Sequence, residues 1–152
     1  GINYYTRGIV ADDPGEPWPS LKDIEGSMNK TQMGWEIYPE GLKNLLIRVS
    51  KNYTDNLPIL VTENGMACAD IMENQTVYDP SRINYISSHL TAASAAIEEG
   101  VNLQGFFYWS LLDNFEWAFG YEKRFGLVHV DFETQKRTPK ASFKELALSL
   151  NS

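Results

Sequence analysis

Apolar residues along this chain follow two alternating patterns. Short runs typical of buried strands occur at 57–62 (LPILVT) and 103–109 (LQGFFYW), and a Tyr-rich, β-prone run stands at 1–6. Elsewhere, apolar residues spaced by three and four positions predict amphipathic helices. These positions are Leu42, Leu45, Leu46 and Val49 for the first helix, Ile83, Ile86, Leu90, Ala93 and Ile97 for the second, and Phe143, Leu146, Ala147 and Leu150 for the third.

Local signals place the ends of these helices. Pro39 suits the first turn of the first helix. Asp79 followed by Pro80 predicts an N-cap and first helical residue, and Gly100 is a natural stop. The resulting order, β-α-β-α-β-α, predicts an α/β fold with a parallel sheet and right-handed crossovers. Residues 8–38 are expected to form a long loop without regular structure, and a hairpin is expected before about residue 132.

Composition excludes several classes of protein. The 152 residues suit one domain, and the net charge of −7 without a Lys/Arg block argues against nucleic acid or an anionic membrane as partner. No apolar stretch reaches about 18 residues, so no transmembrane helix is expected. A single cysteine, Cys68, excludes an internal disulfide, and with only His89 and His129 present we expect no metal site and no cofactor.

The start of the sequence supports two weaker expectations. GINYYTRGIV lacks the features of a signal peptide and a start Met, so we expect residues upstream of it. The absence of a signal and the single cysteine suggest a cytoplasmic location, although a signal could precede this segment.

Polar and aromatic residues stand where the predicted strands end. Tyr5, Glu63 and Trp109 fall at the three carboxyl ends, and Glu116 lies in the loop after the third strand. Because parallel strands end at one edge of the sheet, these side chains are expected to converge there as an active site. A solvated loop position is the alternative for both glutamates, and Asp113 could simply cap a turn.

Aromatic residues make up 12% of the chain and cluster in FFYWSLLDNFEWAFGYEKRFG, at 106–126. Core packing alone could explain many of them. In this segment they alternate with carboxylates, amides and basic groups. That mixture suits a sugar, which has apolar C–H faces and a rim of hydroxyls. His129 and Cys68 are interpreted as structural.

Five ordered motifs make the chain resemble glycoside hydrolase family 1, the retaining β-glucosidase family. They are GINYYT at 1–6, MGWEIYPEGL at 33–42, VTENG at 61–65, GFFYWSLLDNFEWAFGYEKRFGLVHVDF at 105–132 and RTPKASF at 137–143. VTENG alone would be a weak signal, but the five together span almost the whole chain. The resemblance implies a (β/α)8 barrel, of which residues 1–152 would supply the last three βα units, strands six to eight. It also implies an N-terminal part of the same barrel as a partner.

The resemblance implies a role for individual residues. Glu63 would be the catalytic nucleophile, Tyr5 its hydrogen-bond donor, and Asn3 a neighbour of the same carboxylate. The family's acid/base Glu lies in an Asn-Glu-Pro motif that does not occur here, so the isolated chain is expected to be inactive. The implied substrate-binding residues are Trp109, Glu116, Trp117, Trp35 and Phe125.

The residue at position 116 indicates which class of sugar the site would accept. Relatives that cleave 6-phosphoglycosides carry Ser where Glu116 stands, and a carboxylate beside a phosphate would be repulsive. The expected substrate is therefore a neutral β-glucoside or oligosaccharide, with β-galactosidase or β-fucosidase activity possible in addition. A non-catalytic sugar-binding fragment or inactive remnant is the alternative, and an unrelated α/β domain would require five accidental motif matches.

Overall fold

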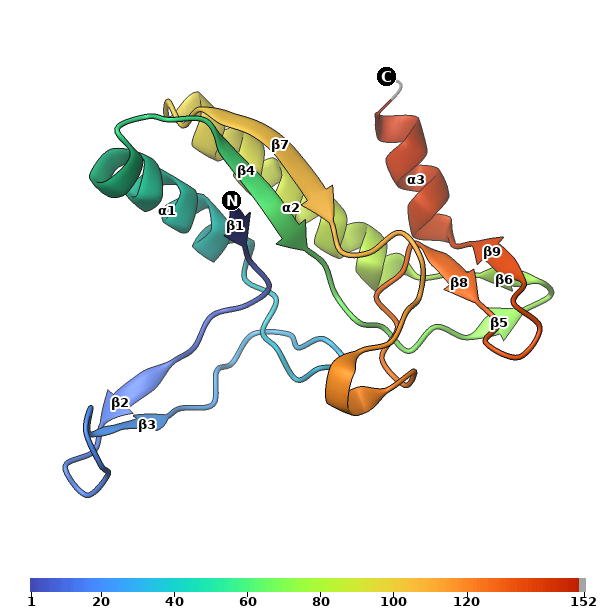
Figure 1. Ribbon diagram of the computed structural model, residues 1–152, viewed down its shortest axis with the longest axis horizontal. Coiled ribbons are helices and arrows are strands. Elements are labelled where there is room, and N and C mark those ends of the chain that lie inside the picture. The colour runs from blue at the N-terminus through green and yellow to red at the C-terminus, as the bar shows by residue number, and fades with distance from the viewer. Residues whose placement is uncertain (151–152) are drawn as a thin grey trace.

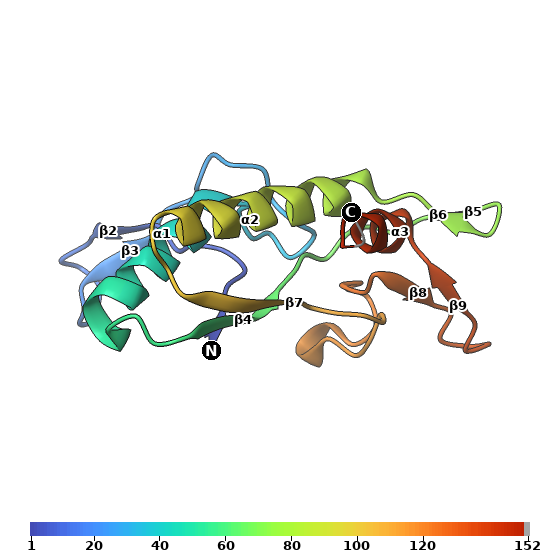
Figure 2. The same cartoon turned by 90° about the horizontal axis from the view of Figure 1, so that it is seen from above.

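A three-stranded parallel sheet with helices on one side forms the centre of the molecule. The computed structural model describes residues 1–150. The strands are β1 (Ile2–Asn3), β4 (Ile59–Asn64) and β7 (Leu103–Tyr108), in the order β1-β4-β7. Helices α1 (Pro39–Val49) and α2 (Pro80–Glu98) cover one face of this sheet (Figures 1 and 2). The predicted βαβαβ order with parallel pairing is confirmed.

The hydrophobic core lies between the sheet and these two helices. Leu42 and Leu46 of α1 are fully buried against Val61 of β4, and Ala96 of α2 is buried beside them. Side chains that point to the opposite face are open: Leu60 of β4 is 38% and Phe107 of β7 is 57% exposed. Among the described residues, the sheet therefore has one covered and one uncovered face.

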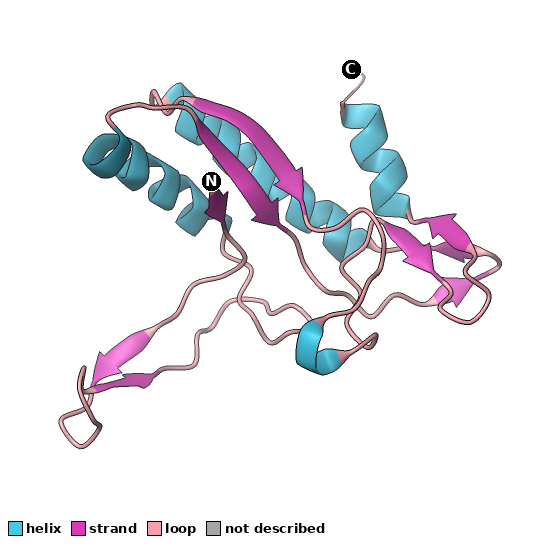
Figure 3. Cartoon of the chain, in the orientation of Figure 1, coloured by secondary structure: helices cyan, strands magenta, loops and turns pink. Residues whose placement is uncertain are grey.

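Three antiparallel hairpins lie outside the central sheet, and the prediction missed most of them. They are β2 (Val10–Asp12) with β3 (Leu21–Asp23), β5 (Met72–Glu73) with β6 (Thr76–Val77), and β8 (Val128–Val130) with β9 (Arg137–Pro139). The expected loop at 8–38 thus contains the first hairpin, which projects as an arm (Figures 1 and 3). Its two strands, VAD and LKD, are three residues each and mostly exposed, which is too short for an apolar alternation to mark them.

The turn of the β5–β6 hairpin has the backbone conformation that a short hairpin needs. Asn74 and Gln75 both have left-handed φ values, 48° and 60°, as a two-residue turn between β5 and β6 requires. The predicted hairpin before residue 132 exists, but its second strand is β9, beyond that point. The chain closes on α3 (Ala141–Ser149), the predicted terminal helix.

Element ends differ from the prediction in small ways. The first strand is shorter than 1–6, and β4 includes Glu63 rather than ending before it. A π-helical turn, Ser50–Thr54, follows α1, and a 3-10 turn, Trp117–Phe119, follows β7. Helix α2 begins at Pro80 as predicted, yet the Asp79 carboxylate makes no capping bond to it. Ile97, expected on the buried stripe, is 49% exposed because the buried face of α2 passes through Ala96 instead.

Candidate active site

Two residues from different strands meet at the carboxyl end of the sheet. The Tyr5 phenol follows β1 and donates a hydrogen bond of 2.7 Å to Oε2 of Glu63 on β4. The Tyr4 N–H also donates to the Glu63 carbonyl at 2.9 Å, which fixes the backbone of the two segments. Burial, and then the hydrogen bond to Glu63, raise the pKa of the Tyr5 phenol well above its usual range. Tyr5 therefore stays protonated and serves Glu63 as a donor.

The two residues after Glu63 are closely packed. Asn64 is fully buried, and its Nδ2 donates to the Tyr4 carbonyl at 2.8 Å and to Tyr85 Oη at 3.1 Å. Gly65 follows Asn64, and the packing around it shows why this position needs a glycine. A Cβ at Gly65 would lie 1.9 Å from the carbonyl oxygen of Trp109, so the backbones of β4 and β7 meet too closely for any side chain.

Asn3 lies beside Glu63 without a recorded bond to it. Its Cα pairs with that of Glu63 in the parallel ladder of β1 and β4. Its Oδ1 accepts a hydrogen bond of 2.6 Å from Thr62 Oγ1, and the side chain is exposed. Asn3 is therefore at the predicted place, but its amide is directed to Thr62.

The second predicted carboxylate stands on a tight turn after β7. The Glu116 N–H donates to the Gly120 carbonyl at 2.6 Å, and the Glu116 carbonyl accepts from the Phe119 N–H at 2.8 Å. Burial, and then the negative charge of Glu63, raise the pKa of Glu116. The two carboxylates are thus close enough to interact. Trp117, next in the turn, is 81% exposed with a φ of 41°.

Aromatic rings from three segments pack around Tyr5. The Trp35 ring centroid lies 5.5 Å from that of Tyr5, and the Phe125 centroid lies 6.2 Å from both. Phe125 is only 2% exposed and packs against both of these rings. Trp109 is partly buried, and its N–H donates to the Asn64 carbonyl at 2.8 Å. Tyr5, Glu63, Trp35, Trp109 and Glu116 thus belong to one end of the sheet.

Sequence reasoning missed a buried cluster of charges next to this site. Asp113 was interpreted as a turn cap, but it is 4% exposed and pairs with Lys140 at 2.8 Å and Arg124 at 2.6 Å. Although burial opposes ionisation, these two cations hold the pKa of the Asp113 carboxyl below its usual value. The cluster continues through Asp70, Arg82 and Asp79. No spacing of charged residues in the sequence predicts this cluster, because its members come from four separate segments.

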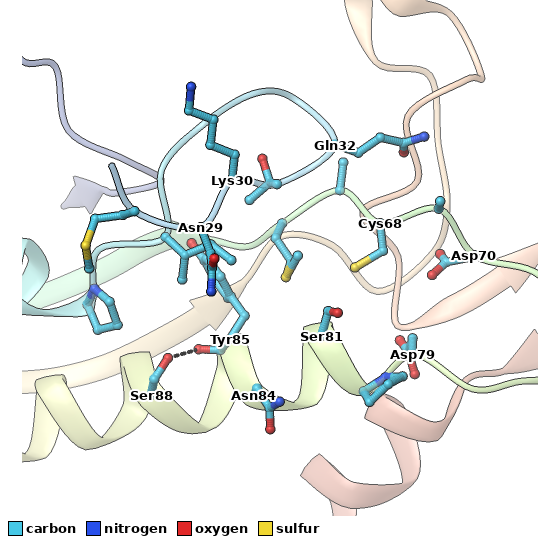
Figure 4. A pocket seen from close by; sticks show the side chains of 18 of the residues that line it. Asn29, Lys30, Gln32, Cys68, Asp70, Asp79, Ser81, Asn84, Tyr85 and Ser88 are labelled. Carbon is cyan, nitrogen blue, oxygen red and sulfur yellow. Dashed lines mark hydrogen bonds between the residues drawn. The ribbon is translucent and has the colours of Figure 1, made fainter. Parts of the chain in front are cut away.

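A cavity of about 890 Å³ lies away from these residues (Figure 4). It is bounded by residues 28–32, the segment 66–70 and the first turns of α2, and neither Glu63 nor Glu116 lines it. Burial raises the pKa of the Cys68 thiol on its wall to about 11, which keeps that thiol protonated at neutral pH. Within residues 1–150, no three His, Cys, Asp or Glu side chains are grouped to hold a metal, and no helix is long and apolar enough to cross a bilayer.

Comparison with known proteins decides the family. Residues 1–148 match the sequence profile of Glycosyl hydrolase family 1. The chain belongs to glycosyl hydrolase family 1. Its solved relatives include a family 1 β-glucosidase from Thermotoga maritima in complex with isofagomine lactam, with a TM-score of 0.92 and 44% identity, covering 98% of this chain and 33% of that one. The fold is therefore part of a family 1 (β/α)8 barrel.

Curated relatives within the family differ in their described substrates. A bifunctional β-D-glucosidase/β-D-fucosidase from Bifidobacterium breve is 46% identical over 160 residues, covering 94% of this chain and 35% of the relative. A 6-phospho-β-galactosidase from Leptotrichia buccalis is 44% identical over 160 residues, covering 93% of this chain and 34% of the relative. The chain thus spans about a third of the length of the family members it matches.

Proposed function

We propose that these residues form the C-terminal part of a retaining β-glucosidase, a single barrel domain of which they supply strands six to eight and the following helices. The open face of the sheet supports this, since Leu60 and Phe107 would become interior residues of a closed barrel. The outer edges of β1 and β7 are free among the described residues, as expected where further strands pair. The partner is the N-terminal part of the same barrel.

The observation that best supports the activity is the hydrogen bond from Tyr5 to Glu63 at the end of β4. A nucleophilic carboxylate must stay ionised, and a donated hydrogen bond favours its charged form. In the proposed reaction, a Glu63 oxygen forms a bond to the anomeric carbon while the bond to the leaving oxygen breaks. An acid/base Glu from the N-terminal part gives that oxygen its proton. The same residue then takes a proton from the water that releases the sugar from Glu63.

The remaining site residues are assigned to holding the sugar. Glu116 can accept hydrogen bonds from two neighbouring hydroxyls through its two oxygens, and Trp117 adjoins it. Trp109 offers an aromatic face under the sugar ring, and Trp35 one on the leaving-group side. Phe125, which packs against Tyr5 and Trp35, is assigned to the wall of the same sugar pocket.

We further propose a neutral sugar as substrate. Glu116 and Glu63 already place two interacting carboxylates at the site, which disfavours a sugar phosphate. Lys123, the cation nearest to Glu116 in sequence, donates to the Gln32 carbonyl at 3.2 Å. The 44% identity to a 6-phospho-β-galactosidase makes phosphorylated galactosides the second candidate. The missing acid/base residue leaves a non-catalytic sugar-binding fragment as the third.

The decisive experiment uses the complete polypeptide that contains this chain. We expect a 2-deoxy-2-fluoro aryl glucoside to label Glu63, and Glu63→Gly to abolish hydrolysis. Azide should then restore cleavage of an activated aryl glucoside and yield the inverted glycosyl azide. Labelling at another carboxylate would overturn the assignment, and a wild-type preference for a 6-phosphoglycoside would favour the second candidate.

A further inference from the structure

The turn that bears Glu116 is closed at its base by one buried carboxylate. Asp113 Oδ1 accepts from the Gly126 N–H at 2.9 Å, and the Asp113 N–H donates to the Val128 carbonyl at 3.1 Å. A Cβ at Gly126 would lie 2.2 Å from the Asp113 nitrogen, so the two sides of the loop touch at this point. Glu116 therefore sits on a closed loop, residues 113–126, whose base is Asp113.

One buried cation connects this base to the segment that follows Glu63. Lys140 is 0% exposed, and its Nζ lies 2.8 Å from Asp113 Oδ1. The same ammonium donates to Asp70 Oδ2, in the segment between β4 and β5. Asp70 is held in turn by the Arg82 guanidinium of α2, with both contacts at 2.9 Å. Lys140 thus joins the loop after β7 to the segment after β4.

This arrangement suits the chemistry of lysine. An ammonium carries three donors on one compact charge, so it can serve two carboxylates from different segments at once. Full burial makes each contact strong, but it also makes the loss of the cation costly, because Asp70 and Asp113 would then face each other with less compensation. The position of the Glu116 loop relative to Glu63 therefore depends on this side chain.

We propose that Lys140 is a positioning residue that fixes the Glu116 loop against the segment carrying Glu63, and so sets the recognition of the sugar hydroxyls that Glu116 binds. The catalytic part of this inference rests on the proposed function. Lys140 itself touches no substrate in this scheme. Its effect passes through Asp113 to Glu116.

The first test follows the loop without using activity. In the complete polypeptide, Lys140→Met should raise amide hydrogen exchange across residues 114–122 by about tenfold, whereas Lys140→Arg, which keeps the charge but is bulkier, should raise it less. Leu46→Ala serves as a control that loosens the core of α1 far from this loop. If Lys140→Met alone fails to fold, the double variant Lys140→Met/Asp113→Asn removes one uncompensated charge and takes its place.

The second test uses a series of monodeoxy aryl glucosides. A hydroxyl is bound by Glu116 if its removal lowers kcat/KM of the wild-type enzyme but does not lower kcat/KM of Glu116→Ala. For Lys140→Met we expect kcat/KM to fall about tenfold or more on the parent glucoside, and by less than about threefold on the analogues lacking those hydroxyls. Lys140→Arg, which keeps the positive charge, should lose less than Lys140→Met on the parent glucoside.

The results of these tests distinguish the positioning role of Lys140 from the proposed function of the enzyme. An equal loss on every sugar, or unchanged exchange in 114–122, would overturn the positioning role of Lys140. A wild-type polypeptide that cleaves no β-glycoside would overturn the proposed function instead, and the exchange data would still decide whether Lys140 anchors the loop.

Discussion

The Tyr5 phenol donates a 2.7 Å hydrogen bond to Oε2 of Glu63, joining two strands whose residues are 58 positions apart. Because the bond is made to a carboxylate, it is stronger than a bond between neutral groups. This pair is the centre of the proposed active site, and it leads to the first prediction.

Tyr5→Phe should lower kcat/KM of the complete enzyme by about 10–100-fold, the range expected for losing a hydrogen bond to a charged group. Tyr4→Phe is the matched control, since that hydroxyl donates to the Tyr38 carbonyl at 2.6 Å. Steady-state kinetics on an aryl β-glucoside measure both variants, and a Tyr5→Phe enzyme as active as wild type would contradict the role of Tyr5.

Glu116→Ser should weaken cleavage of an aryl β-glucoside by about 1.5–3 kcal/mol of transition-state binding, because a charge-assisted contact to the sugar is lost. Glu122→Ser, at an exposed position in the same loop, should leave kcat/KM within about twofold. Steady-state kinetics on a glucoside and a 6-phosphoglucoside measure both effects. Equal losses of kcat/KM in the two variants would show that Glu116 does not bind the sugar.

Gly65→Ala should destabilise the protein by about 1–3 kcal/mol, because the new Cβ would meet the Trp109 carbonyl oxygen. Gly8→Ala, where nothing lies within 4 Å of an added Cβ, should change stability by less than about 0.5 kcal/mol. Denaturant unfolding of both variants gives the comparison. Equal stability would mean that β4 and β7 lie further apart at this point.

Because His89 is buried, the free energy of unfolding should depend on pH in the acidic range. His89 is fully buried in α2, its Nδ1 donates to the Tyr85 carbonyl at 2.8 Å, and burial lowers its pKa to about 4. The unfolded chain binds a proton near pH 6.5, so the folded state loses stability as pH falls from about 6.5 to about 4, by about 3 kcal/mol in total.

Denaturant unfolding at pH 8 and pH 5 should therefore show a smaller pH dependence in His89→Gln than in wild type. The variant has no group to titrate at this position, so the difference between the two proteins isolates His89 from other histidines. Parallel pH profiles would show that folding leaves the pKa of His89 unchanged, which would contradict its burial as a neutral group.

The 152 residues alone should hydrolyse no aryl glucoside at a useful rate. They lack the proposed acid/base residue, whose help typically contributes about 10²–10⁴-fold, and the open sheet admits water to the site. Adding a polypeptide with strands one to five should restore activity. The assay needs a sample shown by mass spectrometry to be free of longer polypeptide, and turnover near that of an intact family member would contradict the prediction.

Much of this protein is determined by its sequence alone. The spacing of apolar residues is a local property, so it predicted α1, α2, β4 and β7, and with them the parallel order of the sheet. That order brings the carboxyl ends of the strands together at one edge. The positions of Glu63 and Glu116 in the sequence therefore predicted that both belong to the same edge of the sheet. The family followed from ordered motifs, and the match over residues 1–148 confirmed it.

Only the tertiary structure decided how the two carboxylates are held. Lys140 and Asp70 are 70 positions apart, and Asp113 lies in a third segment, so no local pattern connects them. Burial of a charge depends on what packs around it, which is why Asp113 resembled a turn residue in the sequence. The same holds for Gly65, whose requirement comes from the Trp109 carbonyl of a neighbouring strand rather than from its own turn.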